Sequence, residues 1–382
     1  MALRIVVVVG QFRPAIGGTE VQSARLANEW AARGHHTEVW TRRLRPDLAI
    51  EEREGAALIR RLGWTLRSGG LPFLRLEKLS FACALWIRLL RTRNEYDVVI
   101  AQQALYPAIV AAMASLATGR PLVLRIASSG VTSDLATLGR FSGAILSLLR
   151  KATRALVVLS RQGATEAGAK GFPQKRIHEI PNGLEPGPEP PARPLDRKAH
   201  VVYVGVFRPE KKIDLLLRSW AQAGSPGRLS LAGEGPLRPD LEQLARDQRV
   251  DVSFLGHVAD VRALLRDADI FVLSSDAEGM SNALLEAMAE GCACLATYVG
   301  GNVDCLAPGS KAPARGEIVR GAAGWLVNAG DEAAMTEALG ILCGDHDLRE
   351  ALGRAARARA ASEYALENTA DKYLKVFQAL VA

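Results

Sequence analysis

Short apolar segments alternate with amphipathic segments along most of the chain. In the first half, β-branched runs bounded by turn residues predict strands at residues 5–9, 37–40, 98–101, 122–126 and 156–159. Helical periodicity lies between several of these runs, for example over residues 21–32 and 107–117. Strands that alternate with helices are typical of βαβ units, whose strands form a parallel sheet. The first half is therefore predicted to be a doubly wound α/β domain.

The same alternation resumes in the second half, with strands predicted at residues 201–204, 228–231, 252–255, 270–273 and 294–297. Between the halves, the turn Pro181-Asn182-Gly183 is followed by a proline-rich stretch, which is typical of a stiff connector. We predict an N-terminal domain over residues 1–184, a linker over 185–199, and a C-terminal domain over 200–362. A last helix over residues 363–382 could cross back to the first domain.

Composition agrees with a two-domain protein that has a sizeable core. The chain has 382 residues, of which 48% are hydrophobic and 23% charged. No apolar run is long enough to span a bilayer, and no cleavage pattern follows residues 5–9, so a cytoplasmic location is expected. The five cysteines have neither disulfide-framework nor zinc-ligand spacing, and we interpret them as reduced core residues.

Charge is distributed unevenly between the halves. Residues 1–185 contain 26 Lys plus Arg against 14 Asp plus Glu, whereas the remainder contains 22 against 27. Basic residues crowd residues 42–93, interleaved with tryptophan and phenylalanine, which suits phospholipid headgroups, a lipid pyrophosphate or nucleic acid. No nucleic-acid module accompanies them, so peripheral contact with the inner face of an anionic membrane is favoured. A generally solvated basic face is the alternative.

The densest motif of polar residues covers residues 274–291. A strand ends there, Ser281 or Asn282 can cap a helix, and that helix places Glu278 on the loop and Glu286 about one turn inside. The free N–H groups and the dipole of a helix N-terminus attract a diphosphate. Glu278 could then accept hydrogen bonds from a sugar and Glu286 from a ribose, which favours a nucleotide sugar as the ligand.

Two further loops carry candidate phosphate ligands. Arg208 and Lys211 follow the strand over residues 201–204, where positive charge can neutralise a leaving diphosphate. In the first domain, Gly17 and Gly18 precede a helix and let backbone amides approach a phosphate or sugar closely. This loop lacks the G-x-G-x-x-G fingerprint, so a nicotinamide enzyme is not expected.

Together these motifs resemble glycosyltransferase family four, whose members have the GT-B fold of two facing Rossmann-like domains. The motifs that carry the resemblance are Gly17-Gly18-Thr19-Glu20, residues 180–183, 204–211, 232–236 and 254–258, and the glutamate motif continuing to residue 301. The resemblance implies a retaining enzyme that needs no bound metal or other cofactor. We therefore expect an α/β GT-B protein with a cleft between two parallel-sheet domains.

The resemblance also implies roles for individual residues. Glu278 would contact the donor sugar, Lys211 and Arg208 the diphosphate, and Glu286 the ribose. The predicted donor site also includes Gly205, Gly233, Gly256, His257, Val258, Gly279, Met280, Ser281, Asn282 and Leu285. The first-domain loops expected near the acceptor or a phosphate contain Gly17, Gly18, Thr19, Ser128 and Ser129.

The chain departs from the family pattern at two places. The family commonly has an arginine directly after the strand-ending glycine, where this chain has Val206, so Arg208 would have to serve instead. The family often has a histidine after the strand over residues 122–126, where Ser128 or Ser129 would line the acceptor pocket here. The rest of that pocket is expected in first-domain loops within residues 42–93. His257 could touch the base, but a histidine in a turn at a strand end is more often a solvated or packing residue.

The function predicted from these residues is transfer of a sugar from a nucleotide diphosphate sugar. An envelope glycolipid or polysaccharide precursor is the favoured acceptor, because the first domain is basic. A soluble natural product or sugar phosphate is an alternative acceptor. A catalytically silent nucleotide-sugar binding protein is a third possibility, motivated by Val206 and by the missing histidine.

Overall fold

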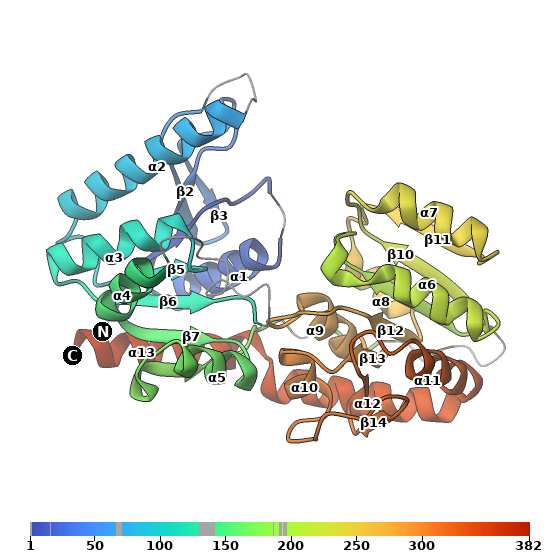
Figure 1. Ribbon diagram of the computed structural model, residues 1–382. Coiled ribbons are helices and arrows are strands. Elements are labelled where there is room, and N and C mark those ends of the chain that lie inside the picture. Colours follow the sequence, from blue (N-terminus) through green and yellow to red (C-terminus); the bar gives the residue numbers. More distant parts are fainter. Residues whose placement is uncertain are drawn as a thin grey trace. The chain divides into compact units, whose positions relative to one another are not determined.

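The structure is a computed structural model that describes residues 2–15, 17–65, 71–129, 142–185, 187–190, 193 and 197–382, without the side chains of residues 71–74 and 142. It divides into two compact units (Figure 1). Unit 1 comprises Met1–Gly183 and Leu366–Ala382, and unit 2 comprises Leu184–Ala365. Each unit contains one sheet with helices packed against it, which confirms the predicted α/β class.

The sheet of unit 1 has eight strands in the order β3-β4-β2-β1-β5-β6-β7-β8. All neighbours are parallel except the edge pair β3 and β4, which is antiparallel. The strands are β1 (Arg4–Val9), β2 (His36–Arg42), β3 (Glu51–Glu54), β4 (Ala57–Leu62), β5 (Val98–Gln102), β6 (Leu122–Ile126), β7 (Thr153–Val158) and β8 (Ile177–Glu179).

Two hydrophobic cores cover the two faces of this sheet, since successive strand residues point to opposite faces. Val6 and Val8 of β1 enter one core, and Ile5, Val7 and Val9 enter the other. The helices are α1 (Gly18–Ala32), α2 (Leu71–Arg91), α3 (Tyr106–Thr118), α4 (Ser142–Ala152), α5 (Arg161–Ala169), the short 3₁₀ helix η2 (Gln174–Arg176) and α13 (Leu366–Val381).

The C-terminal helix α13 is part of unit 1, although it is far in sequence from the other elements there. The ring of Trp30 in α1 lies edge-on to Tyr373 at 5.5 Å and to Phe377 at 5.2 Å between centroids. All three side chains are buried, so α13 contributes directly to the core of unit 1.

Residues 42–93, where the sequence predicted acceptor loops, are mainly regular structure. They include β3, β4 and α2, while Arg67 lies outside the described residues. Several arginines in this region are already paired within the unit. The side chain of Arg61 is only 2% exposed and donates to Glu52 at 2.7 Å, and Arg60 donates to Glu38 at 2.7 Å. Much of the local positive charge therefore stabilises the β3–β4 edge of the sheet.

The sheet of unit 2 has seven strands in the order β11-β10-β9-β12-β13-β15-β14. Its strands are β9 (His200–Val204), β10 (Arg228–Ala232), β11 (Val252–Gly256), β12 (Ile270–Leu273), β13 (Ala293–Thr297), β14 (Ile318–Gly321) and β15 (Gly324–Val327). The edge pair β14 and β15 is antiparallel and the other pairs are parallel.

The helices of unit 2 pack in two groups, with α6 against α7 and α11, and α9 against α8 and α12. Their bounds are α6 (Ile213–Gln222), α7 (Arg238–Asp247), α8 (Val261–Asp267), α9 (Asn282–Ala289), α10 (Gly301–Leu306), α11 (Glu332–Gly344), α12 (His346–Glu363) and the 3₁₀ helix η3 (Pro209–Lys211).

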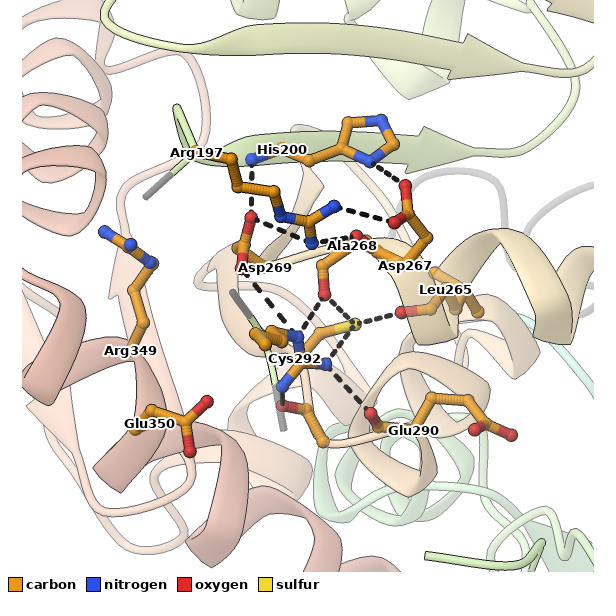
Figure 2. Close-up of polar contacts among 12 residues, drawn as sticks. Arg197, His200, Leu265, Asp267, Ala268, Asp269, Glu290, Cys292, Arg349 and Glu350 are labelled. Carbon is orange, nitrogen blue, oxygen red and sulfur yellow. Dashed lines mark hydrogen bonds and ion pairs between the residues drawn. The ribbon is translucent and has the colours of Figure 1, made fainter. Parts of the chain in front are cut away.

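The proline-rich stretch predicted as a connector is bound to unit 2 where the structure describes it. Arg193 donates to the carbonyl oxygens of Ala268 at 2.7 Å, Gly291 at 2.8 Å and Glu290 at 3.0 Å. Arg197 forms an ion pair with the Asp267 carboxylate at 2.7 Å (Figure 2). Residues 186, 191, 192 and 194–196 of the predicted linker lie outside the described residues.

His200 lies beside this network (Figure 2). Arg228 lies 2.7 Å from Nδ1, and Nε2 lies 2.9 Å from Ser230 Oγ. Asp267 also faces Nδ1, at 3.0 Å. Burial, reinforced by the Arg228 charge, lowers the pKa of His200 below its ordinary value.

Acid is expected to destabilise the protein through His200. Below the ordinary pKa of 6.5, His200 is protonated in the unfolded chain but not yet in the folded protein. The free energy of unfolding therefore falls as the pH decreases from 6.5 to the lowered pKa of the folded state. Urea unfolding at several pH values should show a shallower slope in this range for His200→Gln. Equal slopes for His200→Gln and wild type would contradict the assignment.

The cysteines are free thiols, but the prediction that all five lie in the core was wrong for Cys83. Cys292, Cys294 and Cys305 are buried, and Cys343 is partly buried, whereas Cys83 is exposed on α2. Cys83 is exposed because it lies on the side of α2 that faces away from the sheet.

Among the described helices, none is long and apolar enough to cross a membrane.

Candidate functional site in unit 2

The order of strands in unit 2 places two catalytic candidates at one edge of its sheet. The chain runs outward from β9 to β10 and β11, and then returns to pair β12 with the opposite side of β9. At such a reversal the two following loops diverge, and open α/β sheets bind ligands there, at the carboxyl ends of the strands. Lys211 follows β9 and Glu278 follows β12.

Lys211 and Glu278 are in direct contact. Lys211 Nζ donates to Glu278 Oε1 at 2.5 Å, and Ser275 Oγ donates to the same oxygen at 3.0 Å. The two charged side chains are 22% and 10% exposed, so they are largely shielded from water but can be reached from one side. An ammonium group and a carboxylate fixed side by side can bind a phosphate oxygen and a sugar hydroxyl that lie next to each other.

Buried serines hold the two loops together. Ser274 Oγ donates to the backbone carbonyl of Lys211 at 2.9 Å, and the backbone N–H of Asp276 donates to the carbonyl of Glu210 at 2.8 Å. The hydroxyl of Thr297 donates to the carbonyl of Ser275 at 2.5 Å. Ser274, Ser275 and Thr297 are completely buried, so the Lys211–Glu278 pair rests on a fixed backbone.

Helix α9 begins directly after this loop. Ser281 is its N-cap residue and accepts a hydrogen bond from the N–H of Leu284 at 3.3 Å, which confirms the predicted cap. Asn282 is the first helical residue, and Glu286 lies one turn further along. The first N–H groups of the helix therefore lie at the same sheet edge as Glu278 and Lys211.

The loops after β9, β10 and β11 lie side by side at the same edge. The N–H of Gly205 donates to Ala232 at 3.0 Å, and the N–H of Gly233 donates to Gly256 at 2.8 Å. Gly233 has φ of 143°, and a Cβ there would collide with the carbonyl oxygen of Gly205. A glycine is therefore required for this close approach, which brings predicted donor-site residues of three separate strands together.

Tyr203 lies beneath these loops and was not identified from the sequence. Its ring is fully buried, and its hydroxyl has no hydrogen-bond partner among the described residues. Burial, and then the negative charges of Glu278 and Glu210, raise the pKa of the phenol. Tyr203 therefore stays protonated at neutral pH. Apolar strand patterning concealed this residue, because Tyr203 lies inside the run over residues 201–204.

The remaining predicted donor residues are distributed around this edge. Arg208 is exposed and forms no side-chain ion pair with the described residues, and neighbouring Val206 is 41% exposed. His257 is exposed and Val258 is partly buried at the turn after β11. The donor residues around α9 that are buried are Gly279, Met280 and Leu285. The structure brings Lys211, but not the Arg208 side chain, into contact with Glu278.

The predicted acceptor residues lie in unit 1, at the carboxyl ends of its strands. Gly17 is the extended N-cap residue of α1, and Gly18 and Thr19 begin that helix. A Cβ on Gly17 would meet the carboxylate end of the buried Glu20 side chain, which would then have to shift. Ser128 is partly buried and Ser129 is buried, just beyond β6. The predicted loop residue Ile16 lies outside the described residues.

Sequence reasoning missed the residues that support the pair. Ser274 and Ser275 stand inside the quoted glutamate motif, but nothing in their spacing indicated which partner each serine bonds.

Within the described residues, no three His, Cys, Asp or Glu side chains form a group that could hold a metal ion.

Comparison with known families gives matches over both units. A model described as "Glycosyl transferase 4-like domain" matches residues 17–183, and a model described as "Glycosyl transferases group 1" matches residues 198–345. Between them, the two models account for most of the chain.

Individual relatives are distant. N-acetyl-alpha-D-glucosaminyl L-malate synthase of Bacillus anthracis is 26% identical over 181 residues, which is 46% of this chain and 44% of that protein. A GDP-mannose-dependent monoacylated alpha-(1-6)-phosphatidylinositol monomannoside mannosyltransferase of Corynebacterium glutamicum is 28% identical over 226 residues, which is 53% of this chain and 56% of that protein. The chain thus spans about half the length of these relatives.

A solved structure is similar over nearly the whole chain. Sucrose-phosphate synthase from Thermosynechococcus elongatus has a TM-score of 0.81 and 21% identity, and the match covers 99% of each chain. At this identity the likeness demonstrates a shared fold.

Proposed function

The chain belongs to the group 1 glycosyltransferases. From that premise we propose that it transfers a sugar from a nucleotide diphosphate sugar to an acceptor hydroxyl with retention of configuration. The observation that carries this proposal is the Lys211–Glu278 pair, 2.5 Å apart at the strand reversal of unit 2. The mannosyltransferase relative is named for its GDP-mannose donor, which supports a nucleotide sugar here.

In the proposed reaction, the bond between the anomeric carbon and the phosphate oxygen breaks, and its electron pair leaves with the nucleoside diphosphate. Lys211, Arg208 and the N–H groups at the start of α9 neutralise the charge that develops on the leaving group. The acceptor oxygen bonds to the anomeric carbon from the same face, and its proton passes to a phosphate oxygen. Neither an enzymic nucleophile nor a metal ion takes part in this scheme.

Glu278 orients the sugar in this scheme. Its Oε1 is bonded to Lys211 and Ser275, which fixes the carboxylate in the position where the sugar hydroxyls would donate to it. Glu286 binds the ribose hydroxyls from the second turn of α9. The turns at Gly233 and Gly256 border the base.

The acceptor we favour is an envelope glycolipid or polysaccharide precursor at the inner face of the membrane. The mannosyltransferase relative is named for a lipid acceptor, which supports this choice. The synthase relative is named for L-malate, which supports a soluble acceptor as the second candidate. A nucleotide-sugar binding protein without transferase activity would share the donor site but form no product.

Nucleotide binding is expected to raise the melting temperature. A thermal-shift panel of UDP, GDP, ADP, TDP and their common sugars should give one responsive base. At a ligand concentration of roughly 100 Kd, stabilisation is about 2.7 kcal/mol, or a shift of about 5–10 °C for a unit of this size. Adding EDTA should not change the shift.

Glu286→Ala should abolish this shift, whereas Glu242→Ala should retain it. Glu242 is an ordinary surface glutamate that pairs with Arg238 on α7 at 2.8 Å. Absence of any shift at millimolar nucleotide would reject the donor site. A shift without sugar transfer to any acceptor would favour the non-catalytic alternative.

A further inference from the structure

The helices on one side of unit 1 expose an apolar outer surface. Helices α2, α3 and α4 pack side by side there, with α3 between the other two (Figure 1). Their inner surfaces contribute to a single hydrophobic core beneath them. We call these three helices the helical layer.

Helix α2 is apolar on two opposite sides. Phe81, Leu85 and Leu89 are completely buried against the sheet and α3. Leu76, Leu79 and Ile87 are 46%, 59% and 45% exposed, and exposed Cys83 lies between them. At about 100° per residue, positions 76, 79, 83 and 87 form one stripe that points away from the buried side.

The apolar surface extends beyond α2. Met113 and Leu116 of α3 are 40% and 45% exposed, and α3 contains no charged residue. Trp64 is 50% exposed and adjoins α2, where Ser80 Oγ accepts a hydrogen bond from its backbone N–H at 3.1 Å. Single exposed apolar residues are common on proteins, but several of them on neighbouring helices indicate a binding surface.

The exposed charges on the three helices have one sign. The only acidic residue in the three helices is Glu77, which is buried and accepts from Thr65 at 2.8 Å and from Arg42. The exposed charged residues of the helical layer are Arg75, Lys78, Arg91 and Lys151, all of them basic. None of these four forms an ion pair with the described residues.

We propose that the helical layer docks on an anionic lipid bilayer, with α2 lying in the plane of the interface. Leu76, Leu79 and Ile87 enter the boundary between headgroups and acyl chains, and the surrounding basic side chains contact lipid phosphates. A second copy of this chain fits the surface less well, because a symmetric contact would bring its basic residues together. Docking requires no sugar donor, so its test is independent of the transfer reaction.

Vesicle sedimentation tests the proposal directly. The purified chain should pellet with vesicles of phosphatidylcholine plus phosphatidylglycerol, more weakly with phosphatidylcholine alone, and less at high salt. The double variant Leu79→Glu/Ile87→Glu should lose binding, and Lys78→Glu should weaken it about tenfold, because it reverses one interfacial charge. Ile50→Glu should bind like wild type, since Ile50 is 59% exposed like Leu79 but lies outside the helical layer.

The native Cys83 gives a second measurement that does not depend on a mutation. Cys83 is exposed and the other four cysteines are buried or partly buried, so an environment-sensitive fluorophore can be attached to it selectively. Its emission should shift to shorter wavelength with anionic vesicles and be quenched by lipids labelled in the acyl chain.

Three results would overturn the proposal. These are no pelleting of the wild type with anionic vesicles, equal loss for Ile50→Glu, or an unshifted label in vesicle-bound protein. Light scattering that shows a dimer broken by Leu79→Glu, without vesicle binding, would instead assign the surface to self-association.

Discussion

Replacing Lys211 with alanine is expected to lower kcat about 100- to 1000-fold, the usual cost of removing one preorganised group that stabilises transition-state charge. The ammonium group is 2.5 Å from Glu278, and Ser274 fixes the backbone that carries it. Binding of the intact donor should weaken less than kcat, because the leaving diphosphate gains charge only as the bond breaks. The measurement is steady-state kinetics of sugar transfer or, lacking an acceptor, of donor hydrolysis.

The neighbouring Lys212 offers a matched control. Its side chain is 41% exposed and pairs with Asp276 at 3.4 Å. Lys212 therefore carries the same charge as Lys211 on the same loop, but its partner lies on the surface. Lys212→Gln should retain kcat within about twofold, as expected for a surface pair. Equal losses for both variants would indicate damage to the loop, and an unchanged Lys211→Ala would exclude the proposed charge stabilisation.

Replacing Glu278 with glutamine is expected to lower kcat by about two orders of magnitude with little change in melting temperature. Glutamine keeps the shape of the side chain but loses the charge that holds Lys211 and would strengthen hydrogen bonds from the donor sugar. The amide oxygen of glutamine can still accept the hydrogen bond from Lys211, so the ammonium group keeps a partner and the loss of stability should be small. Kinetics and thermal unfolding of the same preparation provide the comparison.

A double-variant cycle tests whether the pair acts as a unit. Lys211→Ala/Glu278→Gln should be far less impaired than the product of the two single effects, since each single change disables the same contact. Glu242→Gln should leave kcat unchanged, because Glu242 pairs with Arg238 on the surface of α7. Fully multiplicative losses would show that the two residues act separately.

Much of the fold could be predicted from the chain because buried parallel strands leave a strong local signal. The run over residues 5–9 is fully apolar, and β1 is buried on both faces between the two hydrophobic cores of unit 1. The cap at Ser281 and the helix after it are equally local, since they depend on side chains within one turn.

Other elements have weak or misleading local signals. Helix α2 was missed because it is apolar on two sides, which obscures the periodicity of a half-buried helix. Strand β4 was missed because Arg60 and Arg61 interrupt its apolar alternation, although both arginines are paired with carboxylates. A charge-rich pattern does not distinguish a solvated loop from a strand whose charges are neutralised by neighbours.

The sequence by itself determined the βα alternation of both halves, the helix cap beside Glu278, and the residue types able to bind a diphosphate and a sugar. These properties depend on interactions within a few residues of the chain. Only the tertiary structure decided that Lys211, and not Arg208, contacts Glu278, because that contact joins residues 67 positions apart through the pairing of β9 with β12. It also decided which side of α2 remains exposed, since burial depends on the partners that each surface meets.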